Sequence, residues 1–232
     1  MLATIINAIA IVAGSLVGLL FKKGLAKRYE QAIFTAAGIV SLVVGIQMAV
    51  KTSHVLAFAI ALILGGLLGT ALDIEGAVFR LGEGLKRRFA KDEEGGSFAL
   101  GFLNASVLYC SGAMAIVGSF KAGTEHDYAL ILTKSVLDGL LSILFASAMG
   151  VGVAFSALSV LAYQGILTLV SVWVKPYVSP LMLGELTGIG GALVIMIGIN
   201  LLELKKLKTG DFLPGLVFTV LLVLAMPFAS FL

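Results

Sequence analysis

Residues 129–150 read ALILTKSVLDGLLSILFASAMG, and residues 151–174 continue as VGVAFSALSVLAYQGILTLVSVWV. No charged residue follows Asp138 until Lys175. About 20 apolar residues in an α-helix cross the roughly 30 Å of hydrocarbon in a bilayer. This run is too long for one crossing. The segment Met149-Gly150-Val151-Gly152 therefore predicts a tight turn between two membrane spans.

The composition of the whole chain supports a membrane location. Of 232 residues, 59% are hydrophobic and 12% are charged, and the mean hydropathy is +1.10. A soluble domain has about 25% charged residues, so this chain has too few charges to cover a water-facing surface. Its 28 glycines suit close packing of transmembrane helices. The composition predicts an all-α, polytopic transmembrane helix bundle, with the lipid bilayer as its main partner and no nucleic acid.

Apolar blocks of similar length predict about eight spans. They are Leu2–Phe21, Gln31–Val50, Val55–Ala71, Phe98–Phe120, Ala129–Gly150, Val153–Val174, Leu181–Leu202 and Leu213–Phe231. The basic residues test this number, because cytoplasmic loops are enriched in Lys and Arg. Of the 16 Lys and Arg residues, twelve fall in alternate loops, three fall in the opposite loops, and Lys134 falls inside a span. We therefore predict that both termini lie outside the cytoplasm.

The segment from Glu75 to Lys91 is not a span. Its apolar residues recur at helical spacing among Arg and Lys residues, which predicts an amphipathic helix on the anionic cytoplasmic leaflet. Gly82 and Gly84 would weaken such a helix. A solvated basic linker is the alternative.

The sequence contains an apparent internal repeat. Residues 38–47, GIVSLVVGIQ, resemble residues 191–200, GALVIMIGIN, and in both a side-chain amide (Gln47 or Asn200) follows two glycines spaced seven residues apart. On the predicted topology these two spans run in opposite directions. The single integral membrane domain, residues 1–232, would then consist of an inverted pair of halves, 1–73 and 153–232, around a hairpin at 98–150. Inverted repeats recur in alternating-access transporters, although chance similarity between glycine-rich apolar helices is the alternative.

Lys134 and Asp138 are ionisable residues inside a predicted span, where each charge is costly. Their i, i+4 spacing puts them on one face of a helix, where they can pair. Asp138 could take up a proton or cation and thereby release Lys134. Alternatively, the two could form a self-neutralised pair that only packs helices together.

Other polar residues in the spans are further candidates for a solute or ion pathway. The fourth span could line a solute site or break as a helix, or its small residues could simply pack closely. Glu185, near the start of the seventh span, could instead interact favourably with the positive end of the helix dipole. The further candidates are Asn104, Cys110, Ser111, Gly112, Tyr163, Gln164, Glu185, Gln47 and Asn200.

No metal site or cofactor is expected. His54 and His126 both fall in loops, and Cys110 is the single cysteine, so no metal-ligand cluster forms. For the same reason no Ser-His or Cys-His pair exists at membrane depth, and we do not expect an enzyme.

Several stretches resemble one known family. They are YCSGAMAIVGS at 109–119, KSVLDG at 134–139, FSA at 155–157, YQG at 163–165, Gly190-Gly191, and the opening Asn7 with GSLVG at 14–18. Together they are similar to a widespread bacterial membrane family known as domain of unknown function, number 554. The resemblance covers nearly the whole chain. It implies a bacterial plasma (inner) membrane location and a transport role, but no substrate and no established site residues.

The leading functional hypothesis is a secondary transporter or channel-like carrier of a small solute or ion, coupled to protons or cations through the Lys134–Asp138 pair. The chain has no nucleotide-binding loop, so any coupling would come from an ion gradient. The alternative is a non-transporting structural, assembly or regulatory subunit that acts through its basic amphipathic segment. Two-fold oligomers are the commonest kind, so a homodimer is the expected assembly.

Overall fold

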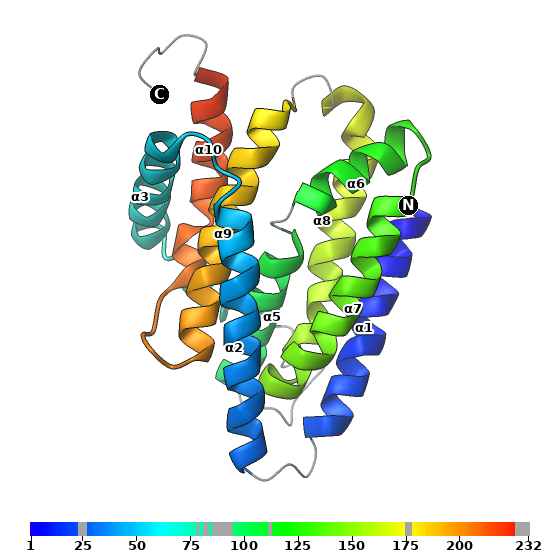
Figure 1. Ribbon diagram of the computed structural model, residues 1–232, viewed down its shortest axis with the longest axis vertical. Coiled ribbons are helices and arrows are strands. Elements are labelled where there is room, and N and C mark those ends of the chain that lie inside the picture. The colour runs from blue at the N-terminus through cyan, green and yellow to red at the C-terminus, as the bar shows by residue number, and fades with distance from the viewer. Residues whose placement is uncertain are drawn as a thin grey trace. The chain divides into compact units, whose positions relative to one another are not determined.

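The computed structural model describes residues 1–22, 27–77, 79–80, 84, 95–110, 113–174 and 178–225. Within these ranges the chain is helical, and no strand occurs among them (Figure 1). The main elements are α1 (Leu2–Lys22), α2 (Lys27–Ala49), α3 (Val55–Ala71), α5 (Gly95–Cys110), α6 (Ala113–Thr124), α7 (Ala129–Met149), α8 (Gly152–Val174), α9 (Pro180–Leu201), the 3-10 helix η2 (Thr209–Phe212) and α10 (Pro214–Ala225).

Four helices are long and apolar enough to cross a membrane. They are Leu2–Phe21, Ala129–Met149, Gly152–Trp173 and Pro180–Leu201. A bent pair of helices makes a fifth if it is one span, and shorter apolar helices cover Phe34–Ala49, Val55–Ala71 and Thr209–Ala225. An all-α bundle with several helices apolar enough to cross a membrane is thus confirmed, while the number of eight spans stays a prediction. Most of the predicted amphipathic segment 75–91 lies outside the described residues.

The bent pair is α5 and α6. The axes of Phe98–Cys110 and Met114–Thr124 differ by 60°. The sequence predicts a single span over Phe98–Phe120, so the bend divides that span into two half-helices. The C-terminal end of α5 at Cys110 carries the negative end of its helix dipole.

The predicted turn between α7 and α8 is confirmed. Gly150 has a φ of 85°, a left-handed conformation that glycine adopts without steric cost. Its N–H donates the last hydrogen bond of α7, to the carbonyl of Ala146 at 2.9 Å, and its positive φ then ends the helix. Two antiparallel helices can therefore follow each other without a polar loop.

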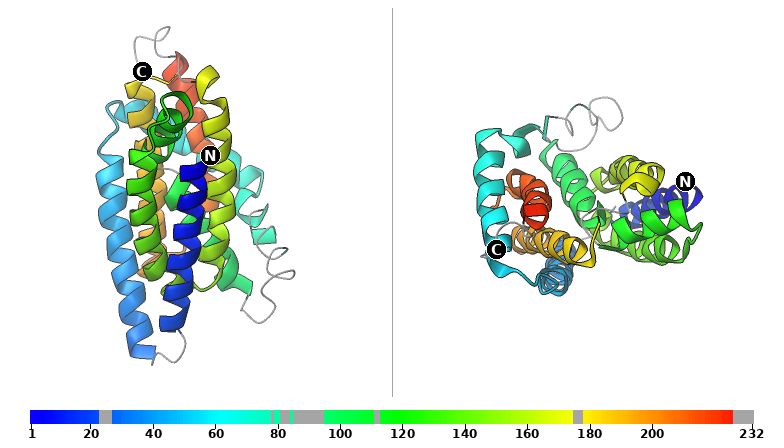
Figure 2. Two further views of the ribbon diagram at one scale, coloured as in Figure 1. Left: turned by 90° about the vertical axis from the view of Figure 1, so that its right-hand side faces the viewer. Right: turned by 90° about the horizontal axis from the view of Figure 1, so that it is seen from above.

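The chain divides into two compact units. The first contains α1, the start of α2 up to Ala37, and α5 to α8. The second contains α2 from Gly38 together with α3, α9, η2 and α10. In the first unit α1 packs against α7 and α8, and α5 packs against α8 and α7. In the second unit α10 packs against α3 and α9, as the view from above shows (Figure 2).

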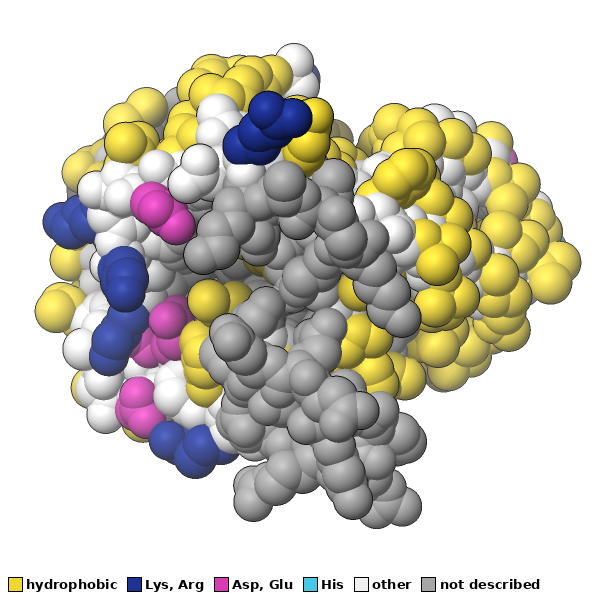
Figure 3. Space-filling view, turned by 90° about the horizontal axis from the view of Figure 1, so that it is seen from below, with side chains coloured by type: hydrophobic (Ala, Val, Ile, Leu, Met, Phe, Trp, Pro, Cys, Tyr) yellow, Lys and Arg dark blue, Asp and Glu magenta, His cyan; other side chains and the backbone are white. Residues whose placement is uncertain are grey.

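Glycine allows α1 and α7 to pack in direct backbone contact. A Cβ atom at Gly14 would overlap the carbonyl oxygen of Gly139, and one at Gly18 would overlap the carbonyl oxygen of Ile143. Large apolar side chains cover the opposite faces, for example Leu20 of α1, which is 71% exposed, and Leu140 of α7, which is 60% exposed. Such an apolar exterior is typical of helices in lipid. In the view from below, Lys, Arg, Asp and Glu side chains are visible beside hydrophobic ones (Figure 3).

Candidate functional site

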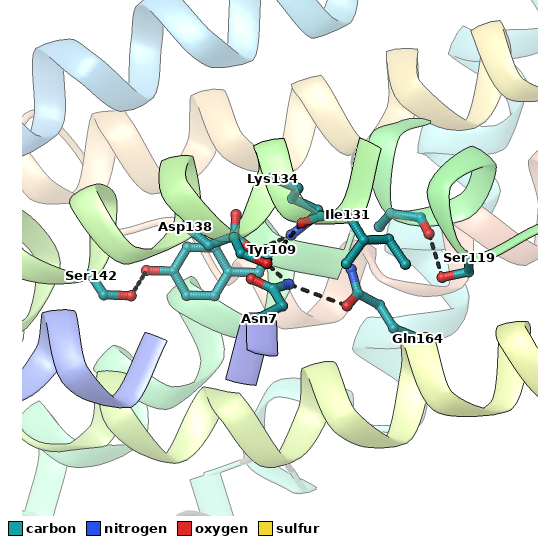
Figure 4. Close-up of polar contacts among 10 residues, drawn as sticks. Asn7, Tyr109, Ser119, Ile131, Lys134, Asp138, Ser142 and Gln164 are labelled. Carbon is teal, nitrogen blue, oxygen red and sulfur yellow. Dashed lines mark hydrogen bonds and ion pairs between the residues drawn. The ribbon is translucent and has the colours of Figure 1, made fainter. Parts of the chain in front are cut away.

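The centre of the candidate site is an ion pair on α7. Lys134 Nζ contacts Asp138 Oδ2, and each residue is 5% exposed (Figure 4). One turn of helix separates them, as the i, i+4 spacing predicts. Both charges are thus out of contact with water, and each depends on its neighbours for compensation.

Two amide side chains from other helices complete this centre. Asn7 of α1 donates from Nδ2 to Asp138 Oδ2 at 3.1 Å and to Gln164 Oε1 of α8 at 3.2 Å. Both Asn7 and Gln164 are fully buried. The contacts join α1, α7 and α8 through one polar cluster, shown in Figure 4. Gln164 was predicted as a pathway candidate and Asn7 was not, although an amide inside an apolar span is a signal of the same kind.

The end of α5 lies beside the same pair. Lys134 Nζ sits 5.7 Å from the centroid of the Tyr109 ring, a cation–π distance. The Tyr109 hydroxyl is 2.8 Å from Ser142 Oγ on α7. Cys110, the last residue of α5, lies close enough to Lys134 and Asp138 to interact with their charges. The half-helix end and the ion pair therefore share one environment.

Four polar atoms near this cluster have no hydrogen-bond partner within the described part of the chain. They are Thr4 Oγ1, Asn7 Oδ1, Gln164 Nε2 and Thr168 Oγ1. All four residues are at least nine-tenths buried. Ser15 Oγ, about two turns further along α1 than Asn7, is a fifth such atom. A buried polar group without a partner costs about 1–3 kcal/mol, so five within α1 and α8 form an unusual concentration.

The remaining candidates of the first unit have simpler surroundings. Asn104 is buried and donates to Met149 Sδ at 3.5 Å. Tyr163 of α8 is partly buried. Ser111 and Gly112 lie outside the described residues.

Glu185 belongs to the second unit, where it binds the loop between α2 and α3. Its Oε1 accepts hydrogen bonds from the backbone N–H groups of Ser53 at 2.7 Å and His54 at 3.0 Å, and its Oε2 accepts from the Thr52 hydroxyl. Ser179 caps the helix start, and the first turn of α9 holds no acidic residue. Glu185 therefore connects the α2–α3 loop to α9 through hydrogen bonds. These hydrogen bonds explain a charged residue at this position better than an interaction with the helix dipole does.

Gln47 and Asn200 also lie in the second unit. Gln47 is exposed on α2. Asn200 closes the connection between α9 and α10, because its amide accepts from Leu207 N–H at 2.7 Å and donates to the Leu207 carbonyl at 2.9 Å. These contacts give Asn200 a structural role in its own loop.

An apolar groove of about 780 Å³ lies between α1 and α8. Ile5, Ile9, Val12, Phe155 and Leu158 are among its lining residues, all of which are hydrophobic. The groove thus lies on another face of α1 than Asn7. It holds none of the polar groups described above.

Comparison with known proteins agrees with a membrane protein whose role is open. A family described as "Protein of unknown function (DUF554)" matches residues 2–224. The Bacillus subtilis (strain 168) "Uncharacterized membrane protein YdfK" is 33% identical over 220 residues, 93% of each chain. The Escherichia coli (strain K12) "Uncharacterized protein YqgA" is 27% identical over 228 residues, 97% of this chain and 94% of that protein. No solved structure matches.

Proposed function

The chain belongs to the DUF554 family of unknown function, and from that premise we propose that it is a secondary transporter or channel-like carrier of a small solute or ion. The observation that carries the proposal is the buried Lys134–Asp138 pair, which contacts Asn7 of α1 and lies beside the end of α5. Proton or cation binding at this pair would couple transport to an ion gradient.

The free-energy cost of burying the two charges supports a functional role for the pair. Breaking a buried ion pair by removing one partner costs about 3–5 kcal/mol, whereas apolar residues of similar volume are often as stable as the intact pair. Packing alone therefore gives little reason to place two charges here. Protonation of Asp138 would leave Lys134 without its counter-charge, and this is a change that a transport cycle can use.

The bend between α5 and α6 supports the same proposal. Secondary transporters often bind substrate and coupling ions where a broken helix exposes unpaired backbone groups near the middle of the membrane. α5 ends at Cys110, and its last turn lies beside the pair, since Lys134 Nζ is 5.7 Å from the Tyr109 ring. The negative end of the α5 dipole would attract the cationic group of a solute or a coupling cation.

We propose that all eight predicted segments cross the plasma membrane, with both termini outside. The apolar helices Phe34–Ala49 and Val55–Ala71 are shorter than the four long ones, yet a span of about 17 residues reaches across the hydrocarbon core. The concentration of Lys and Arg in alternate loops supports this topology.

We also propose that the two halves are related by inversion, and the packing of α2 on α9 supports it. A Cβ atom at Gly38 would lie 3.2 Å from the carbonyl oxygen of Gly198, and one at Gly198 would lie 2.9 Å from that of Gly38. Gly45 and Gly191 show the same reciprocity, at 2.9 and 2.6 Å. A two-fold rotation that exchanges Gly38 with Gly191 and Gly45 with Gly198 maps one contact pair onto the other. This is the relationship expected of an inverted repeat.

Reconstitution into liposomes tests the proposed function. Purified protein would be assayed with an internal pH-sensitive dye under imposed proton, Na⁺ and K⁺ gradients, with and without a panel of small solutes. We expect wild-type protein to give a flux above that of empty liposomes. Asp138→Asn should lose the flux. Asp127→Asn, which removes a carboxylate from the loop between α6 and α7, should retain it.

The absence of flux under every gradient, together with an Asp138→Asn variant that supports cell growth as wild type does, would overturn the transporter proposal. A wild-type flux that Asp138→Asn leaves unchanged would retain transport but remove the coupling role of the pair.

A further inference from the structure

We propose that Thr4, Asn7, Gln164 and Thr168 form a binding site for a chain of water molecules that connects Asp138 to the membrane surface at the start of α1. The inference rests on the proposed function, because it gives the coupling ion as the proton and the route as this chain. It is carried by their side-chain atoms, which are four of the five buried polar side-chain atoms that lack partners among the described residues.

Helix geometry places these four residues in one row. Thr4 and Asn7 are three residues apart on α1, and Gln164 and Thr168 are four apart on α8, so each pair shares a helix face. The Asn7–Gln164 hydrogen bond joins the two faces. Met1 lies against Gly165, while Leu16 and Ala154 line the same groove. The helices are therefore antiparallel, and Thr4 and Thr168 both lie one turn beyond the Asn7–Gln164 contact, toward the start of α1.

The free groups suit water better than a metal cation. Gln164 Nε2 can only donate hydrogen bonds, Asn7 Oδ1 can only accept them, and the two threonine hydroxyls can do either. A cation site would need oxygen ligands throughout, and the Gln164 amide nitrogen does not fit one. Buried water typically makes about three hydrogen bonds to groups that would otherwise lack partners. A water chain would satisfy all four atoms.

The surrounding charges make Asp138 the natural end of this chain. Lys134 on α7 pairs with Asp138, and Asn7 on α1 donates to it. Tyr109 and Cys110 face the pair from α5, and Tyr163 of α8 lies near Cys110. Asn7 donates one hydrogen bond to Gln164 and one to Asp138. Among the groups facing this region, the Asp138 carboxylate is therefore the one joined directly to the row. A proton that arrives through the water chain would therefore reach Asp138 first.

An apolar cluster lies at the level of the far end of the row. Ala3, Ala122 and Ile131 form a buried cluster, with Tyr128 packed against it. A Cβ atom at Gly118 of α6 would lie 2.9 Å from the Ile131 side chain. Ala3 precedes Thr4, so the cluster lies at the depth of the outer end of the row. Truncation of Ile131 should widen access to the row.

Thiol labelling tests the water chain without any need for transport. In a Cys110→Ala background, single variants Thr168→Cys and Leu169→Cys are treated in cells with a charged, membrane-impermeant methanethiosulfonate reagent. The two positions share the same depth, but Leu169 is 62% exposed on the outer surface of the bundle, where lipid is expected. Only thiolates react, and they do not form in an apolar medium, so Thr168→Cys should label at least about tenfold faster than Leu169→Cys.

Adding Ile131→Ala should raise the rate of labelling at Thr168→Cys further. Equal, slow labelling at both positions with Ile131→Ala present would overturn the water chain, even if the liposomes show flux. Clear labelling without any flux would support the hydrated row and count against transport. If the Cys110→Ala background is not expressed, the same rates can be read from the separate peptides by mass spectrometry with Cys110 retained.

Discussion

Asn7 donates a 3.1 Å hydrogen bond to Asp138 although 131 residues separate them in the chain. The same amide group also donates to Gln164, so one side chain joins three helices. This arrangement gives the carboxylate of Asp138 two donors, Asn7 and Lys134, on different helices. A change of charge at Asp138 would consequently alter contacts to α1 and within α7 at once.

The Lys134–Asp138 pair should behave differently when one member or both are replaced. Asp138→Leu or Lys134→Met alone leaves an uncompensated buried charge and should reduce the free energy of unfolding by about 3–5 kcal/mol. The double variant carries no charge and should recover most of that loss. Thermal unfolding in detergent, followed by the fluorescence of Trp173, measures these differences.

Transport should not recover with stability. If the pair couples transport, the double variant should be stable yet give no ion-dependent flux. A double variant that transports as wild type does would show that the pair serves packing alone. Leu137→Met on the exposed face of α7, where Leu137 is 48% exposed, is the matched control and should change neither property.

The close contact of α1 with α7 should not tolerate a side chain at Gly14. Gly14→Val would place its Cβ on the carbonyl of Gly139, and such overpacking typically costs about 1–3 kcal/mol. We expect a lower melting temperature, with further loss because α1 also carries Asn7. The control Leu16→Val changes a residue of α1 that is 57% exposed and should have little effect. An unchanged melting temperature for Gly14→Val would contradict the observed backbone contact.

Local features of this fold were predictable from sequence, because they depend on residues close together in the chain. The turn at Gly150 follows from the length of the apolar run, and the facing of Lys134 and Asp138 follows from helix periodicity. The neighbours of Asp138 were not predictable. An apolar helix presents similar side chains in every direction, so nothing in α7 specifies that Asn7 lies opposite.

The division of the span at Cys110 was also only partly predictable. Small residues in the run 110–115 suit a helix break, but they suit close helix packing equally well. The role of Glu185 was missed for a related reason. Its partners are backbone N–H groups of Ser53 and His54, and such groups leave no signature in the amino-acid sequence.

Glu185 should stabilise the loop between α2 and α3. Replacement by alanine removes the acceptor for two backbone donors and the Thr52 hydroxyl, and hydrogen bonds to charged groups contribute about 1.5–3 kcal/mol each. Glu185→Ala should therefore lower the melting temperature and speed hydrogen exchange at Ser53 and His54. Glu185→Gln keeps one acceptor oxygen and should have a smaller effect. The exposed Glu203→Ala is the control, and exchange rates like those of wild type in Glu185→Ala would refute this role.

Glu75 should make stability depend on pH. It lies between α3 and the segment 81–91, where its carboxylate accepts from Gly210 N–H at 2.8 Å and its own N–H donates to Asp211 at 2.9 Å. Burial raises the pKa of Glu75 above its usual value of 4.5. The Gly210 hydrogen bond opposes this increase, and the charge of Asp211 adds to it. The folded state therefore binds the Glu75 proton more tightly than the unfolded state does.

The stability from this proton is fully present below the unfolded pKa and is lost as the pH rises through the folded pKa. Glu75→Gln stays neutral and retains an acceptor for Gly210, so it should match wild type near about pH 4 and be more stable near about pH 7. Melting temperatures of both proteins across this range measure the difference, with the exposed Glu203→Gln as control. A Glu75→Gln variant that is less stable than wild type at neutral pH would show that the ionised carboxylate stabilises this loop, which is the opposite sign.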